Sequence, residues 1–283
     1  MIENKTIGDR LKRMRKASGM SQTELAKVLD CDQASISRLE SGIQGISATQ
    51  LVTIAHTYKV DLNSIATGQI NYWGISRDFK RKPKVKKRYQ SYIETYGREV
   101  IPIIRFLNNY KGSEYTQKLL SSLGIEDLAF IPPDEKVSLR CYLDLIGALI
   151  SEGVDLQSHI TKWIEHYNQK EVLGSLTDSF NNTKSPLQVT GLLVHNNSLL
   201  DSIFDQTILE RKDNSFLISM KKKPYLQGVD LERTKIGPVL LNQKVKMHEE
   251  FPKLFSGQPL KGTFTKEFKK NLTGEARLIL EVK

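Results

Sequence analysis

The 283-residue sequence has few of the features that mark secreted, membrane or metal-binding proteins. Its two cysteines, Cys31 and Cys141, form no C-x-x-C motif, so the sequence indicates neither a disulfide framework nor a structural zinc site. It contains no run of about 18 apolar residues, and residues 1–5 lack the apolar core of a signal peptide. We therefore expect a cytoplasmic protein with reduced thiols and no membrane partner.

Catalytic motifs are also missing from the sequence. It contains no glycine-rich phosphate loop, and His248-Glu249-Glu250 lacks the second histidine that an H-E-x-x-H zinc helix requires. His159 and His166 lie on one face of a predicted helix, but a metal would need two further ligands beside them. The sequence therefore predicts no enzyme, no metal site and no cofactor.

Positive charge is concentrated in one short stretch. The chain has a net charge of +10, yet residues 1–75 hold nine Lys or Arg against seven Asp or Glu, and residues 93–283 hold 25 against 24. Residues 76–92 hold eight basic residues and a single acidic one, Asp78. A polyanion that binds this chain by charge is therefore expected to meet residues 76–92.

Two short helices joined by a tight turn are predicted between residues 21 and 42. Ser21 and Glu24 have the spacing of a capping box, which marks a helix start, and Asp32 is placed to cap the second helix. On that second helix, Ile36 and Leu39 fall on the buried side. The pattern is that of a helix-turn-helix, in which the second helix lies in the major groove of DNA.

The outward side of the second helix has the residue types that read base edges. Its members are Gln33, Ala34, Ser37 and Arg38. Glutamine pairs with adenine, arginine pairs with guanine, and an alanine methyl packs against the methyl of thymine. This row predicts a surface that reads double-stranded DNA, although Arg38 also suits a phosphate contact or a surface ion pair.

Residues from about 7 to 68 resemble the Cro/cI-type helix-turn-helix repressors, the xenobiotic-response-element group. The likeness lies in the ordered set of five helices: a first helix ended by Gly19, the two helices described above, and two more at residues 47–58 and 62–66. The resemblance implies an α-helical N-terminal domain that binds DNA.

The resemblance also implies roles for single residues. Gln22 matches a position that contacts a phosphate, and the outward row of the second helix, apart from its serine, matches positions that face the bases. Arg15 matches a position that pairs with the glutamate here numbered Glu40. This pair is expected to be structural, holding the first helix against the second helix of the motif.

The basic stretch directly follows this domain. It includes Lys80, Arg81, Lys82 and Lys84, which we expect to contact the DNA backbone. In this interpretation the stretch is an arm along the phosphates or in the minor groove. A solvated linker without DNA contacts is the alternative.

The rest of the chain predicts an α+β domain, with helices first and antiparallel hairpins later. Residues 94–167 favour helices, with stops at Gly124 and Gly153. The later segments are a β-rich stretch at 187–194, a hairpin from 207 to 220 around Asp213-Asn214, a helix from about 231 to 255 with Pro238 near its first turn or at a kink, and a hairpin formed by 262–268 and 276–282.

Together these patterns predict three parts: a DNA-binding domain at residues 1–70, a basic linker or arm at 71–92, and an effector or dimerisation domain at 93–283. We expect a transcription regulator beside the nucleoid that binds a near-palindromic operator as a homodimer. The order of elements in the last part is loosely similar to small-molecule-sensing domains of the 4-vinyl-reductase type, so a small-molecule or protein effector is expected, or a purely structural role. An antitoxin-like interaction protein and a DNA-tethered enzyme remain alternatives.

Overall fold

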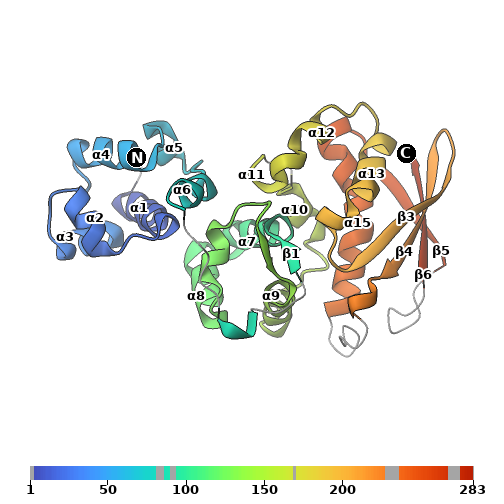
Figure 1. Cartoon of the computed structure of the whole chain (residues 1–283), viewed down its shortest axis with the longest axis horizontal. Coiled ribbons are helices and arrows are strands. Elements are labelled where there is room, and N and C mark those ends of the chain that lie inside the picture. The colour runs from blue at the N-terminus through green and yellow to red at the C-terminus, as the bar shows by residue number, and fades with distance from the viewer. Residues whose placement is uncertain are drawn as a thin grey trace. The chain divides into compact units, whose positions relative to one another are not determined.

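The computed structural model describes residues 3–80, 86–89, 94–167, 170–226, 236–266 and 275–282. The chain divides into two units (Figure 1). The N-terminal unit comprises Met1–Lys84 with Phe130–Pro132, and the C-terminal unit comprises Val85–Ala129 with Pro133–Lys283.

Residues 3–80 of the N-terminal unit form helices and no strand. Its helices are α1 (Asn4–Ser18), α2 (Gln22–Val28), α3 (Gln33–Ser41), α4 (Ala48–Tyr58), α5 (Leu62–Thr67) and α6 (Tyr72–Asp78). The first five confirm the predicted helix order, with Gly19 in the left-handed region at the end of α1. Helix α6 begins inside the stretch that the sequence assigns to the linker, because Asn71 caps it by accepting from the N–H of Gly74.

Helices α1 and α3 cross at very short range. A Cβ at Gly8 of α1 would lie 2.2 Å from the carbonyl oxygen of Leu39, so only glycine permits this approach. Beside the crossing, Leu11 and Ile36 are fully buried. The unit is therefore built around the helix that carries the outward row of polar residues.

The first half of the C-terminal unit is mostly helical, as predicted. It contains η1 (Lys87–Tyr89), β1 (Glu94–Tyr96), α7 (Gly97–Lys111), α8 (Ser113–Leu123), η2 (Glu126–Phe130, whose last residue is counted with the N-terminal unit), β2 (Lys136–Ser138), α9 (Leu139–Ser151) and α10 (Ile160–Glu165). The sequence missed the short antiparallel pair of β1 and β2. The predicted helix that carries His159 and His166 is shorter than expected, because these two residues are the N-cap and the C-cap of α10.

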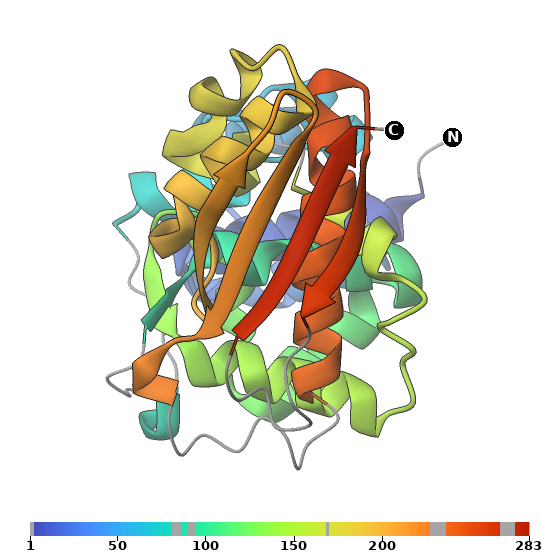
Figure 2. The ribbon, with the colours of Figure 1, turned by 90° about the vertical axis from the view of Figure 1, so that its right-hand side faces the viewer.

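The second half combines further helices with a four-stranded antiparallel sheet. Its elements are α11 (Lys170–Leu173), η3 (Gly174–Leu176), α12 (Thr177–Asn181), α13 (Pro186–His195), α14 (Asn197–Leu200), β3 (Phe204–Arg211), β4 (Ser215–Lys222), η4 (Pro224–Leu226), α15 (Ile236–Ser256), β5 (Leu260–Lys266) and β6 (Glu275–Val282). The strand order is β3-β4-β6-β5, so the two predicted hairpins are joined through β4 and β6 (Figure 2).

One face of the sheet packs on helices. The side chains of Ile218, Met220 and Leu278 are fully buried on this face, and they pack with the buried Val245 of α15 and Leu187 of α13. Pro238 lies in the first described turn of α15, which is one of its two expected positions, whereas residues 231–235 of the predicted helix lie outside the described residues. Residues 267 and 268 of the predicted last hairpin also lie outside them.

The prediction of a β-rich stretch at residues 187–194 is wrong, because this stretch is helix α13. Ser185 caps the helix by accepting from the N–H of Gln188, and Pro186 occupies its first turn. The buried side chains recur at Leu187, Thr190 and Leu193, which is helical spacing. The apolar run alone did not distinguish a buried helix from a strand.

A group of charged side chains lies inside the C-terminal unit. The Nζ of Lys244 on α15 lies 3.6 Å from Oε2 of Glu99 on α7 and 3.5 Å from Oδ1 of Asp201. All three side chains are at most 4% exposed. Further hydrogen bonds satisfy the carboxylates: Glu99 accepts from the N–H and hydroxyl of Ser202, and Asp201 accepts from the N–H groups of residues 203 and 204. This buried ion cluster joins the helical half of the unit to the start of the sheet.

Candidate nucleic-acid interface

The two helices of the motif begin at side-chain caps. Ser21 and Glu24 form the predicted capping box: the serine hydroxyl accepts from the N–H of Glu24 at 3.1 Å, and the glutamate accepts from the N–H of Ser21 at 2.6 Å. Asp32 caps α3 by accepting from the N–H of Ser35 at 2.5 Å. The hydrogen bond from the backbone of Ser21 lowers the pKa of Glu24, and that from Ser35 lowers the pKa of Asp32.

Helix α3 has one buried and one exposed face. Ile36 and Leu39 are 0% exposed. The exposed face carries all four residues that the sequence assigns to base reading, namely Gln33, Ala34, Ser37 and Arg38. Because the opposite face is fixed in the core, the exposed row is presented from a rigid helix.

A chain of hydrogen bonds connects the core to this exposed row. Arg15 forms a two-point ion pair with Glu40, with Nε to Oε1 at 2.5 Å and Nη2 to Oε2 at 3.0 Å. Gln22 donates to the same Oε2 at 2.9 Å, and Gln33 donates to Oε1 of Gln22 at 2.5 Å. The ion pair is largely buried, with 12% and 3% of the two side chains exposed. Arg15 also donates to the carbonyl of Met20 at 2.9 Å, which fixes the start of α2.

Arg38 is held along the exposed face by neighbours that the sequence analysis did not assign. Its Nη2 donates to the hydroxyl of Ser35 at 2.9 Å, and its Nε contacts Oε1 of Gln44 at 3.4 Å. Asp32 lies 3.9 Å from the guanidinium. The three-residue step from Ser35 to Arg38 on a helix was the available signal for the first contact.

The basic stretch is divided between the units. Lys80 is the last described residue before the gap at 81–85, while Arg81, Lys82 and Lys84 lie outside the described residues. Further along, Lys86 donates to the carbonyl of Ser122 at 3.3 Å, within the C-terminal unit. Arg88 similarly reaches the carbonyl of residue 123 at 3.3 Å and the carboxylate of residue 144 at 3.5 Å.

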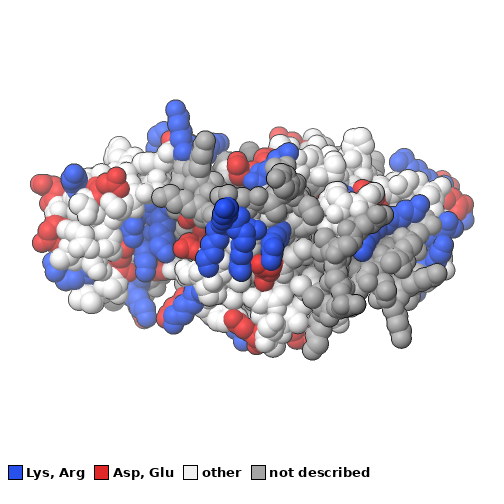
Figure 3. Space-filling model, turned by 60° about the horizontal axis from the view of Figure 1, so that its bottom comes forward, with Lys and Arg blue, Asp and Glu red and all other residues white. Residues whose placement is uncertain are grey.

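The described surface visible in Figure 3 has mixed charge. Figure 3 shows Lys and Arg side chains interspersed with Asp and Glu on the visible face.

Within the described ranges, no group of three or more His, Cys, Asp or Glu side chains is arranged to hold a metal ion. Cys31 and Cys141 are both free thiols. None of the helices in the described part of the chain combines the length and apolar character that a bilayer crossing requires.

Comparison with known proteins identifies the N-terminal motif. Residues 11–65 match the family model described as helix-turn-helix. The matched segment contains α2 and α3 and reaches into α5. The N-terminal unit therefore contains a helix-turn-helix of the DNA-binding, transcription-regulating type. No curated protein matches the chain.

Solved structures resemble a larger part of the chain only weakly. The unliganded Fe(II) H-NOX protein from K. algicida is 13% identical, with a TM-score of 0.44, over 67% of this chain and 97% of that chain. An oxygen-binding H-NOX domain related to soluble guanylate cyclases is 11% identical, with a TM-score of 0.44, over 67% of this chain and 95% of that chain. At these identities and TM-scores the likeness does not indicate what this chain binds.

Proposed function

We propose that this chain is a sequence-specific transcription regulator that binds a near-palindromic operator as a homodimer. Helix α3 lies in the major groove, and the two copies of α3 meet half-sites about one helical turn (~34 Å) apart. The C-terminal unit supplies dimer contacts and senses an effector. The observation that carries the proposal is the exposed row of base-reading side chains on a helix whose other face is buried.

The hydrogen-bond chain behind α3 supports specific contacts for two of its members. The bond to Gln22 uses one N–H of Gln33, so the second N–H and Oε1 suit N7 and the N6 amino group of adenine. Gln22 is in turn oriented by Glu40, and its second N–H suits a phosphate oxygen. Both glutamines are thus positioned before DNA arrives, which reduces the entropy lost on binding.

Selection of bound sequences from random DNA by the full-length protein tests this proposal. The expected product is an inverted repeat with half-site centres about 10–10.5 base pairs apart. Arg38→Ala and Gln33→Ala should each relax the preference at one position per half-site and weaken binding by about 1–3 kcal/mol. Ser41→Ala on the same helix is the matched control, because its hydroxyl donates to the carbonyl of residue 38 rather than facing the bases.

Two results would contradict the proposal. Selection that returns no shared sequence would exclude specific reading, and a sequence without an inverted repeat would exclude the symmetric dimer. Unchanged preference in both α3 variants would show that another surface reads the bases.

The basic stretch is proposed to contact phosphates beside the operator. Changing Lys80, Arg81, Lys82 and Lys84 together to glutamine should flatten the plot of log affinity against log salt by up to about 3–4 units. Binding to operator and to random DNA should weaken by similar factors, because phosphates carry no sequence information. Titrations of both DNAs over a range of salt concentrations measure this slope.

A matched control exists in the same stretch. The double variant Lys86→Gln, Arg88→Gln removes two charges that contact the C-terminal unit, so its salt slope should stay close to that of the parent. An unchanged slope in the fourfold variant would identify the stretch as a solvated linker. A loss of base preference would instead place the arm in the minor groove.

A further inference from the structure

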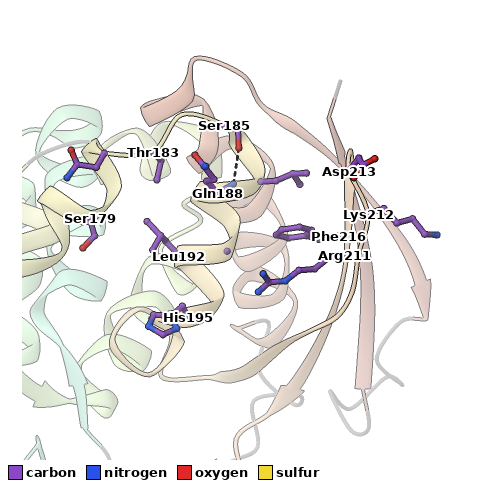
Figure 4. Close-up of a pocket in the computed structure, with 13 residues that line it drawn as sticks. Ser179, Thr183, Ser185, Gln188, Leu192, His195, Arg211, Lys212, Asp213 and Phe216 are labelled. Carbon is purple, nitrogen blue, oxygen red and sulfur yellow. Dashed lines mark hydrogen bonds between the residues drawn. The ribbon is translucent and has the colours of Figure 1, made fainter.

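An open groove lies in the C-terminal unit between helices α12 and α13 and the end of the β3–β4 hairpin. Its volume is about 820 Å³, and it is lined from both sides by polar and apolar side chains (Figure 4). This volume lies within the usual range of small-molecule sites, about 300–1,000 Å³. The residues of the groove are separate in the sequence from α3 and from the basic stretch.

A β-bulge directs Arg211 into this groove. Ile208 pairs with Ile218, but the register then shifts so that Arg211 lies opposite Phe216. Without the bulge, the alternation of a strand would place Arg211 on the other face of the sheet from Ile208. Figure 4 shows Arg211 and Phe216 both pointing toward α13. Bulges often redirect a side chain at a functional site, and this one brings a guanidinium to the helix-facing side of the sheet.

The guanidinium of Arg211 is not neutralised by a carboxylate among the described residues, so it can bind an anionic ligand. Within the described ranges it has no carboxylate partner, and its contact is with the ring of Phe216, 5.6 Å from Cζ to the ring centroid. The neighbouring Lys212 also lines the groove, but its Nζ lies 3.2 Å from Glu210 and its side chain points away from α13. His195 lines the α13 side of the groove. The groove therefore presents an unpaired cation to a ligand.

The α13 wall supplies an apolar surface next to this cation. Leu187 and Leu192 line it, and Gly191 lies between them in the helix interior. A Cβ at Gly191 would meet Phe216 at 4.0 Å, an ordinary contact, so packing does not require glycine here. Glycine in a helix interior costs about 1 kcal/mol relative to alanine. Its effect at this position is to leave open space beside Phe216.

We propose that this groove binds a small carboxylic acid with an apolar, ring-sized body. The carboxylate accepts a two-point hydrogen bond from the guanidinium of Arg211, as this planar group favours. The apolar body lies over Gly191, against Phe216 and Leu192. That such a ligand is the regulator's effector rests on the proposed function, whereas its binding in the groove does not.

The test is a calorimetric titration of the full-length protein in the absence of DNA. The two ligands are 1-naphthoate and its neutral analogue 1-naphthylmethanol. The parent should bind 1-naphthoate saturably and more tightly than the alcohol. Arg211→Gln should weaken naphthoate binding about 10- to 100-fold, as expected when a hydrogen bond to a charged group is lost. The affinity of this variant for naphthoate should then be close to its affinity for the alcohol. Lys212→Gln, the matched control, should change it less than twofold.

A second variant tests the position of the apolar body. Gly191→Leu fills the space beside Phe216 and should abolish binding of both compounds while the circular dichroism spectrum of the protein stays unchanged. Absence of saturable binding in the parent would overturn the proposal, as would equal losses in Arg211→Gln and Lys212→Gln. DNA selection by the same variants is a separate measurement, so a failure of groove binding is distinguishable from a failure of DNA binding.

Discussion

Replacing Glu40 by alanine is expected to speed hydrogen exchange of the α1 and α3 amides on the order of 100-fold in the full-length protein. The change removes one partner of a two-point ion pair and leaves the guanidinium of Arg15 buried with 12% of its side chain exposed. Breaking a buried pair from one side costs about 3 kcal/mol or more. It also removes the acceptor that orients Gln22. Mass spectrometry of exchanged peptides measures the effect helix by helix.

An exposed ion pair in the same unit provides the control. Lys59 and Asp78 lie 3.4 Å apart with 76% and 32% of their side chains exposed, and such pairs contribute about 0–1 kcal/mol. Lys59→Ala should therefore leave exchange in α1 and α3 nearly unchanged. If Glu40→Ala exchanges no faster than Lys59→Ala, the ion pair with Arg15 does not hold α1 against α3. Peptides from α15 should be unaffected in both variants.

The sequence predicted the N-terminal unit well because its signals are local. The caps at Ser21 and Asp32 act on N–H groups three residues away, and Gly19 ends α1 through its own backbone conformation. The buried and exposed faces of α3 follow from helical spacing alone. Local caps and helical spacing were therefore enough to predict which side chains of α3 are exposed. The hydrogen bond from Gln33 to Gln22 was not predicted, because it depends on how α2 and α3 meet.

The C-terminal unit was harder to predict because tertiary contacts decide its details. The apolar run of α13 fits a strand or a buried helix equally well, and the cap at Ser185 is the local signal that favours the helix. The bulge that turns Arg211 toward α13 depends on pairing with β4 and leaves no clear mark in the sequence. The sequence around Lys244 is that of an ordinary helix and does not show its ion-pair partner, because Glu99 lies on a distant segment of the chain.

Replacing Lys244 by methionine is expected to destabilise the C-terminal unit by about 3–5 kcal/mol. Methionine preserves the apolar length of the side chain, but it leaves Glu99 and Asp201 as two buried carboxylates without their shared cation. The carbonyl of Leu200 also loses a donor at 3.3 Å. Urea unfolding of a Trp73→Phe background, followed by the fluorescence of the buried Trp163, measures the loss.

Two comparisons distinguish the buried cluster from general damage to α15. Lys246→Met, two residues away, removes a partly exposed ion pair with Glu249 and should cost no more than about 1 kcal/mol. Adding Glu99→Gln to Lys244→Met removes one uncompensated charge, so the double variant should be less destabilised than the sum of the two single variants. Strict additivity, or equal losses in Lys244→Met and Lys246→Met, would show that the three charges do not act as one cluster.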